Sequence, residues 1–146
     1  MTIIDFGMKL LCFQAKHFRW KSQSKTLAQA ADQDVEEHVT DAVAVFLHAE
    51  QSDEEADKHN SILRQTLKHI KWLANKRGLK NIVIHSFTHL GGETSSPDFA
   101  ESFISAVAQR LREASYSVWT TPFGYFCEWD LSVYGESLAK VWKEIR

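Results

Sequence analysis

One long amphipathic segment near the middle of the chain constrains the fold most, because its apolar side chains follow helical spacing. The positions that recur at this spacing, every three or four residues along the segment, are Ile62, Leu63, Thr66, Leu67, Ile70, Leu73 and Ala74. Ser52 and Glu55 have the spacing of a capping box and predict the start of the helix, and Gly78 predicts its end. The apolar runs 41–49 and 81–86 flank the helix, so they predict two strands joined by a crossover.

The residues before this unit predict two further strands. The run 8–13 is continuously apolar and the run 17–21 alternates, so we expect the two to pair as a hairpin. Residues 22–40 are polar and predict a loop or a weak helix. Residues 1–7 are expected to form a short leader ahead of the folded domain.

The remaining residues predict a second crossover and a C-terminal unit. Ser96 and Pro97 predict the start of another helix, because serine caps free N–H groups and proline at the first position loses no hydrogen bond. Strands are expected over 116–121 and 125–132, and a closing helix over 136–145. The order β-β-β-α-β-α-β-β-α predicts a single α/β domain, a mixed sheet with helices packed on it.

Composition limits the classes of function and the location. The formal net charge is −2, whereas a protein that grips a long phosphate backbone is usually basic, so any nucleic-acid contact is expected to be small and local. The two cysteines, Cys12 and Cys127, have neither zinc-site spacing nor the density of a disulfide framework. No apolar run approaches the ~20 residues of a membrane span, and we expect a cytoplasmic protein with no membrane contact.

Two short motifs carry a resemblance to a known family. Residues 87–90, Phe-Thr-His-Leu, follow an expected strand, and residues 121–126, Thr-Pro-Phe-Gly-Tyr-Phe, come between the two last strands. In this order and spacing they resemble the archaeal threonyl-tRNA synthetase editing domain, whose fold is shared with D-aminoacyl-tRNA deacylases. The resemblance covers residues 8–146 and implies a D-aminoacyl-tRNA deacylase-like fold.

The resemblance also implies an activity and partners. It implies a hydrolase of mischarged aminoacyl-tRNA, of the seryl-tRNA(Thr) type or another aminoacyl ester, which touches only the 3′ end of the tRNA and forms a homodimer. Backbone groups and the terminal 2′-hydroxyl of the tRNA are implied to contribute much of the chemistry, with no metal and no cofactor. Because the chain has no room for an aminoacylation domain, we expect it to act in trans. The alternative is a relative that has lost catalysis and binds aminoacyl-adenosine, tRNA or a protein.

His89 is the first catalytic candidate. It follows the carboxyl end of an expected strand, where α/β sheets place their ligands, and imidazole can donate or accept a proton near neutral pH. A partly buried histidine satisfied by the backbone is the alternative interpretation. The expected substrate-binding residues lie in the two motifs and are Thr88, Phe123, Gly124, Tyr125 and Phe126.

Two positions depart from the family pattern. The resemblance implies a functional lysine where this chain has Cys127 and a glutamate where it has Lys140. Lys140 can return the positive charge to the site if it points there from the last helix, with Glu128 or Glu136 as the carboxylate. If Cys127 lies near His85 and His89, it can also be read as a nucleophile or, with a third ligand, as part of a zinc site. The alternative is a small buried apolar residue.

The C-terminal end of the first helix is basic. Its cations are Lys68, Lys71, Lys76, Arg77 and Lys80. Basic side chains at this end of a helix complement the helix dipole, and contact with a tRNA backbone is the alternative explanation.

Overall fold

The computed structural model describes residues 7–55, 57–91 and 93–146. The strands are β1 (Met8–Lys25), β2 (Glu36–His48), β3 (Asn81–Ser86), β4 (Ser117–Thr120), β5 (Tyr125–Val133) and β6 (Lys140–Ile145). The helices are α1 (His59–Asn75) and α2 (Pro97–Glu113), with short 3₁₀ helices η1 (Gln51–Glu54) and η2 (Ser137–Ala139). Residues 1–6 of the expected leader lie outside the described residues.

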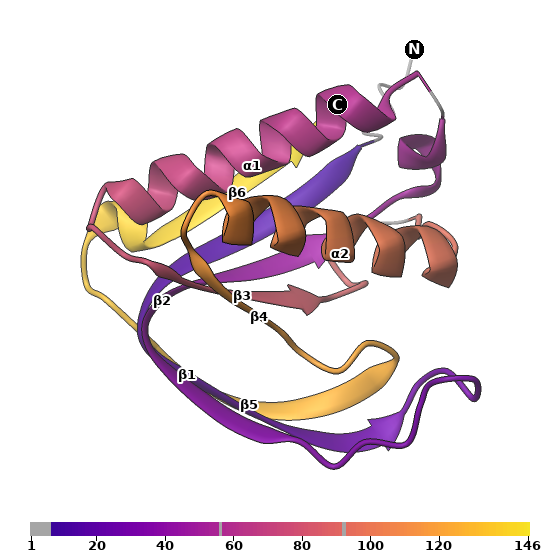
Figure 1. Cartoon of the computed structure of the whole chain (residues 1–146), viewed down its shortest axis with the longest axis horizontal. Helices are drawn as coiled ribbons and strands as arrows, with labels where there is room; N and C mark the ends of the chain where they lie inside the picture. The colour runs from indigo at the N-terminus through magenta and orange to yellow at the C-terminus, as the bar shows by residue number, and fades with distance from the viewer. Residues whose placement is uncertain (1–6, 56, 92) are drawn as a thin grey trace.

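The strands form one mixed sheet, which confirms the predicted α/β class. Its order is β4-β3-β2-β1-β5, and β6 also pairs with β1. β1 is antiparallel to β2, β5 and β6, while β2, β3 and β4 are parallel to one another through the two helical crossovers. Figure 1 shows α1 and α2 on one face of the sheet, and the long strands β1 and β2 curving away beneath them.

Burial follows the predicted periodicities where one face of an element meets the core. The buried side chains of α1 are the seven that the helical spacing selected. Along β2, successive side chains point to opposite faces, so Val45 joins the core under the helices and Phe46 joins a second core on the other face. The second core is aromatic, with Phe18 and Trp20 of β1 packed beside Phe46.

The predicted hairpin within residues 8–21 is wrong. β1 is one strand of 18 residues, and its pairing with β2 continues from Lys9 opposite His48 to Lys21 opposite Glu36. The stretch 14–16 contains no glycine, proline, asparagine or aspartate that would favour a turn. The polar stretch 22–40 is likewise mostly strand at its two ends, where it completes β1 and begins β2.

The start of the first helix also differs from the prediction. The capping box is formed by Glu50 and Asp53 around η1, rather than by Ser52 and Glu55. The α-helix itself begins only at His59. Both carboxylates of the observed box are buried, so the segment that leads from β2 into α1 packs against the end of the sheet.

The predicted C-terminal helix is a strand. Apart from the short η2, this segment pairs antiparallel with β1, from Phe13 opposite Lys140 to Met8 opposite Ile145. Without it, the first half of β1 would be an open edge, and filling a strand edge outweighs local helix propensity. Among the described residues, no helix has the length and apolar character required to cross a membrane.

Candidate functional site

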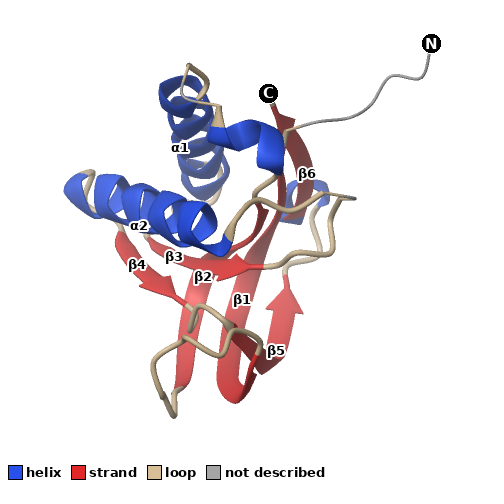
Figure 2. Ribbon diagram, turned by 90° about the vertical axis from the view of Figure 1, so that its right-hand side faces the viewer, coloured by secondary structure: helices blue, strands red, loops and turns tan. Residues whose placement is uncertain are grey.

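A cavity of about 550 Å³ lies beyond the carboxyl end of β3, a size usual for small-ligand sites. The loops after β3 and after β4 both leave the sheet on the side that faces the viewer in Figure 2. The His89 loop, residues 87–96, joins β3 to α2, and the Gly124 turn, residues 121–124, joins β4 to β5. The lining residues come from these two loops, the end of β3, β5, the start of α2 and the connection that follows β1: Thr26, Leu27, His85, Ser86, Phe87, Thr88, His89, Thr94, Ser95, Pro97, Ala100, Pro122, Phe123, Gly124, Tyr125, Phe126, Cys127 and Trp129.

His89 lies in the exposed part of the cavity wall. The N–H of Phe87 donates to the carbonyl of Leu47, 3.0 Å away, which continues the sheet into the loop. The Phe87 ring packs on Phe46 and meets the His89 ring edge-on, with centroids 5.2 Å apart. His89 and Thr88 are both exposed, so their polar atoms are accessible to a molecule that enters the cavity.

His85 forms the floor of the cavity on β3. Its Nδ1 shares a hydrogen bond of 2.7 Å with the hydroxyl of Thr121, which ties β3 to the Gly124 turn. The ring also packs edge-on against Phe46 and Trp129. Burial lowers the pKa of His85 to about 4, so the imidazole is neutral at neutral pH. It can orient a polar group but supplies no positive charge.

The Gly124 turn depends on a left-handed backbone conformation. Gly124 has φ +77°, and its carbonyl accepts hydrogen bonds from the N–H groups of Thr26 and Leu27. A Cβ at this position would lie 3.1 Å from the Cβ of Ala30. The glycine therefore lets the turn approach the connection between β1 and β2.

Replacing Gly124 with alanine is expected to lower the free energy of unfolding by about 1–2 kcal/mol, because a Cβ disfavours the left-handed region. Urea denaturation measures the change. Gly135→Ala is the matched control, since it has no neighbouring atom within 4 Å of an added Cβ. Equal losses in the two variants would contradict a specific requirement at Gly124.

Tyr125 holds the second motif against the same connection. Its hydroxyl donates to the carbonyl of Ala31 at 2.8 Å and accepts the N–H of Gln33 at 2.9 Å. The hydroxyl is therefore engaged, and only the ring of Tyr125 is left to contact a ligand. Phe126 is 59% exposed and offers a large apolar surface at the rim. The predicted substrate-binding residues of both motifs thus line one cavity.

Cys127 lines the cavity but is not set up as a nucleophile. It is half-buried on β5, and burial raises the pKa of its thiol, which disfavours the reactive thiolate. Within the described ranges, no group of three or more His, Cys, Asp or Glu side chains is arranged to hold a metal ion. The structure therefore supplies no third ligand for the zinc alternative.

The structure does not bring Lys140 to the cavity. Lys140 begins β6 opposite Phe13 of β1, whereas Cys127 lies opposite Ser22. These two residues of β1 are nine positions apart, about 30 Å along the strand. The expectation that Lys140 returns the missing charge depended on a C-terminal helix, and the strand β6 directs it elsewhere.

The two carboxylates considered as replacements also lie outside the cavity lining. Glu128 is exposed on β5 and is 3.7 Å from the guanidinium of Arg19. Glu136 is exposed before η2 and forms an ion pair of 2.9 Å with Arg77. Among the described lining residues none is Lys, Arg, Asp or Glu, so the cavity wall has no formal charge when its histidines are neutral.

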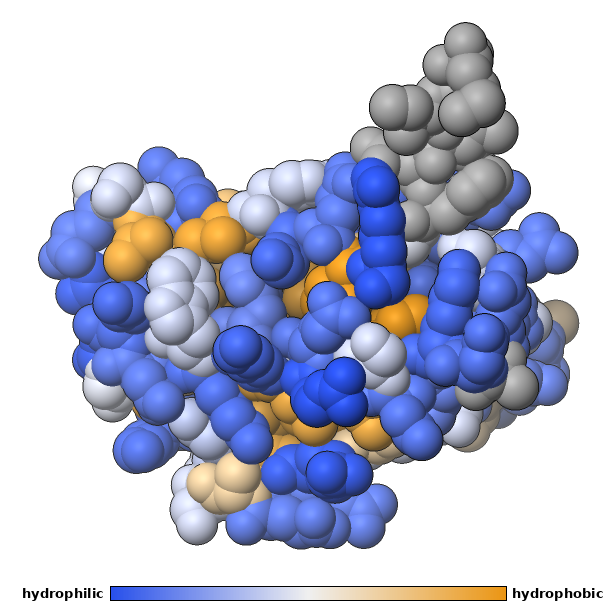
Figure 3. Space-filling view, turned by 90° about the horizontal axis from the view of Figure 1, so that it is seen from above, coloured by the Kyte–Doolittle hydropathy of each residue, from blue (hydrophilic) through white to orange (hydrophobic). Residues whose placement is uncertain are grey.

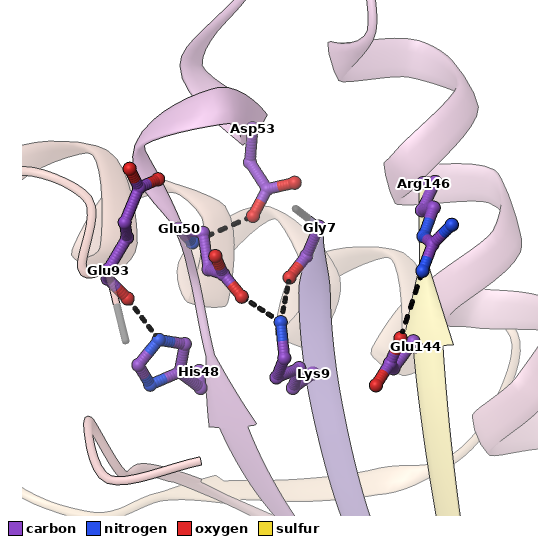
Figure 4. Close-up of polar contacts among 8 residues, drawn as sticks. All are labelled: Gly7, Lys9, His48, Glu50, Asp53, Glu93, Glu144 and Arg146. Atoms are coloured by element: carbon purple, nitrogen blue, oxygen red, sulfur yellow. Dashed lines mark hydrogen bonds and ion pairs between the residues drawn. The ribbon is translucent and has the colours of Figure 1, made fainter. Parts of the chain in front are cut away.

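A buried polar cluster supports the His89 loop from below (Figure 4). Lys9 of β1 and Glu50 form an ion pair and are only 6% and 1% exposed. The ammonium of Lys9 also donates to the carbonyl of Gly7 at 3.2 Å. His48 forms a hydrogen bond from Nε2 to the carbonyl of Glu93 in the loop.

Gly91 allows the loop to lie directly on this cluster. A Cβ at Gly91 would be 3.0 Å from the Glu50 carboxylate and 3.2 Å from His48 Nε2. Farther along the loop, the N–H of Ser95 donates to the carbonyl of Ala49 at 2.9 Å. The end of β2 and the cluster therefore fix the path of the loop that carries His89.

Asp53 gives the cluster a predicted pH dependence. Burial raises the pKa of Asp53 to about 6, although its carboxylate accepts the N–H of Glu50 at 2.7 Å. The folded protein binds this proton more tightly than the unfolded chain, so the contribution of Asp53 to stability falls as pH rises from about 4 to about 6. The full change is about 3 kcal/mol at ~1.4 kcal/mol per pH unit.

Urea denaturation between pH 4 and 7.5 tests this, with Asp53→Asn as comparison because its amide oxygen can still accept the N–H of Glu50. The free energy of the wild type relative to the variant should fall across that interval. A constant difference would show that Asp53 does not titrate there.

Comparison with known proteins assigns the chain to a family. A family model for the archaea-specific editing domain of threonyl-tRNA synthetase matches residues 8–145. The chain belongs to this family. The threonine–tRNA ligase of Methanosphaerula palustris is 32% identical over 139 residues, and that of Methanosphaera stadtmanae is 30% identical over 141 residues. Each match covers 94% of this chain but only 22% of the ligase.

Solved structures show the same fold. A probable eukaryotic D-amino acid tRNA deacylase superposes with a TM-score of 0.66 at 12% identity, over 96% of this chain and 100% of that chain. The c-Myc DNA unwinding element binding protein superposes with a TM-score of 0.59 at 14% identity, over 94% and 99%. The predicted family and the predicted fold are both confirmed.

Several cavity residues of this editing domain were not among the predicted ones. Trp129 shares a strand face with Tyr125 and Cys127, so the alternation along 125–132 could have identified it. His85 was considered only as a neighbour of Cys127 in a nucleophile or zinc site. The contributions of α2 and of residues 26–27 are set by tertiary packing, and no local sequence signal indicates them.

Proposed function

We propose that this chain is a trans-acting hydrolase of mischarged aminoacyl-tRNA. The observation that supports this most is the convergence of both motifs on one cavity at the carboxyl end of β3. Membership in the threonyl-tRNA synthetase editing family supports the proposed substrate class, a tRNA 3′ end that carries a wrong amino acid. In the reaction, a water oxygen bonds to the ester carbonyl carbon, the ester bond breaks, and the ribose oxygen leaves with a proton.

The proposed roles follow from what each side chain presents to the cavity. Aromatic surfaces of Phe123, Tyr125 and Phe126 hold the terminal adenosine, since every base has a face that can stack. The hydroxyl of Thr88 contacts the amino acid, and its branched side chain favours a small one of the seryl type. His89 orders the attacking water or the ribose hydroxyl, and its exposure leaves the ring free to do so.

The uncharged wall supports a mechanism in which the tRNA takes part. Because no lysine or arginine lines the cavity among the described residues, a developing oxyanion must be stabilised by neutral donors. Backbone N–H groups, neutral imidazole and the ribose hydroxyl of the substrate are such donors. Neutral His85 acts as a positioning residue that holds the Gly124 turn through Thr121.

The same uncharged wall favours a second candidate function. Cys127 occupies the position at which the family resemblance implies a lysine, so the chain can also be a binding module that holds aminoacyl-adenosine ends without turnover. In that case Cys127→Lys should start or greatly raise hydrolysis, because it places a cation in the cavity. Lys140→Glu should have no effect, since Lys140 lies on β6 outside the cavity lining.

One experiment separates the two candidates. The wild-type chain is titrated with a non-hydrolysable seryl-adenosine analogue and is also incubated with seryl-tRNA(Thr). If the chain is a hydrolase, it should bind the analogue and release free serine from the tRNA. If the chain is a binding module, it should bind the analogue without releasing serine. The absence of both binding and release would overturn both functions.

A further inference from the structure

A second groove, of about 610 Å³, lies between α1 and α2 on the outer side of the helical layer. Its cations are Arg64, Lys68 and Lys71 from α1 and Arg110 from α2, and the described lining contains no Asp or Glu. Figure 3 looks onto the molecule from the side of α1, and hydrophilic residues dominate that face. The groove is therefore a local concentration of positive charge on a chain whose net charge is −2.

These four cations have no carboxylate partner within ion-pair distance among the residues that the structure describes. Elsewhere on the surface, cations such as Arg19, Lys25 and Arg77 are paired with carboxylates. Arg64, Lys68 and Lys71 follow the spacing i, i+4, i+7, so they form a row about 10 Å long on one side of α1.

The helix dipole does not account for this row. α1 ends at Asn75, and its last turn contains no basic residue. Dipole complementation acts within the last turn, so Arg64 and Lys68 lie too far from the end to benefit. The row of unpaired charges is therefore available to bind an external anion.

Trp72 gives the groove an aromatic side. Its indole is 41% exposed and stacks on His69, with centroids 5.7 Å apart and an interplanar angle of 29°. Lys76 extends over the indole, with Nζ 5.9 Å from the ring centroid. The row of cations can bind a chain of phosphates, and the exposed indole can stack on the attached bases, so the combination favours a nucleic acid. An acidic peptide would use the cations but not the aromatic surface.

We infer that the groove between α1 and α2 binds the sugar–phosphate backbone of RNA. Arg110 lies ten residues along α2 from Ala100 in the cavity wall, about 15 Å along the helix axis. One RNA can therefore contact the groove while its end enters the cavity. That last link rests on the proposed function, whereas RNA binding by the groove does not. The groove also extends the nucleic-acid contact beyond the small, local one expected from composition.

The test compares charge reversals inside and outside the groove. Fluorescence anisotropy measures binding of labelled, uncharged tRNA to the full chain at several salt concentrations. Lys71→Glu is expected to weaken binding about tenfold. It should also reduce the magnitude of the slope of log affinity against log salt by about one unit, which corresponds to the loss of one phosphate contact. Lys140→Glu, the same charge change on exposed β6, should stay within twofold of the wild type. Trp72→Ala should weaken binding with little change in the salt slope.

Three results would overturn the inference. Equal weakening by Lys71→Glu and Lys140→Glu would mean that only the overall charge matters, and unchanged binding in Lys71→Glu would exclude the groove. Displacement of the tRNA by an equal concentration of polyglutamate would indicate an acidic protein partner instead. A minimal aminoacyl-adenosine ester, which is too small to reach the groove, separates RNA binding by the groove from the proposed function. Lys71→Glu should leave hydrolysis of this ester unchanged. If the wild type does not hydrolyse the ester, only the proposed function is affected.

Discussion

Replacing His89 with alanine is expected to lower kcat for release of the amino acid about 100-fold or more, with a smaller change in KM. The expectation follows from the position of His89 in the cavity wall, where its exposed ring can order the water or the ribose hydroxyl. Single-turnover measurements on seryl-tRNA(Thr) give the rate of the chemical step directly. Thermal unfolding of the same variant checks that the fold is intact.

His38→Ala is the matched control for this variant. His38 is an exposed histidine on β2 that packs against His17 and does not line the cavity. Its loss should leave the rate within twofold of the wild type. If His89→Ala retained full activity, the catalytic role assigned to His89 would be wrong even if the chain hydrolyses the ester.

Replacing Lys9 with methionine is expected to lower the free energy of unfolding by about 3–5 kcal/mol, because it leaves Glu50 charged and buried without its partner. Methionine keeps a similar length and apolar stem, so the loss reports the charge rather than a cavity. The His89 loop should also become more mobile, since Gly91 lies against the Glu50 carboxylate. Urea denaturation and hydrogen exchange of the His89 loop measure the two effects.

The double variant Lys9→Met, Glu50→Gln is the control for this prediction. Removing both charges abolishes the uncompensated carboxylate, and the glutamine can keep part of the hydrogen bonding around η1. At least half of the lost stability should return. If Lys9→Met alone lowers the free energy of unfolding by less than about 1 kcal/mol, the Glu50 carboxylate is stabilised by water or by another partner.

Sequence reasoning succeeded where one side of an element meets the core. The helical stripe of α1 and the strand Asn81–Ser86 were predicted correctly because period and burial agree there. The serine and proline at 96 and 97 likewise marked the start of α2, where the Ser96 hydroxyl accepts the N–H of Phe99.

The C-terminal segment shows why the rest was not predictable from local patterns. Leu138, Val141, Trp142 and Ile145 have the spacing i, i+3, i+4, i+7 of a helix, yet Leu138 and Trp142 are exposed and Ile145 is buried in a strand. The open edge of β1 decided the structure, and that edge exists only in the folded sheet. Because Lys140 was placed from the helix, its role in the cavity failed together with the helix.

The cavity was predicted in part for the same reason. Residues of the two motifs carry local signals, a strand end and a glycine turn, and the structure brings them together. The support beneath the His89 loop depends on Lys9, Glu50 and His48, which lie far from it in sequence. A buried ion pair of this kind follows from packing and leaves no local pattern.

The central claim, that the cavity is a site of aminoacyl-ester hydrolysis, is tested most directly by incubating the wild-type chain with a panel of mischarged tRNAs. The panel contains seryl-tRNA(Thr), D-aminoacyl-tRNAs and other mischarged species, and release of free amino acid is measured against spontaneous hydrolysis. We expect accelerated release from at least one member of the panel, fastest for a small amino acid, and loss of this acceleration in His89→Ala. A panel that stays intact in the presence of the folded chain would contradict it.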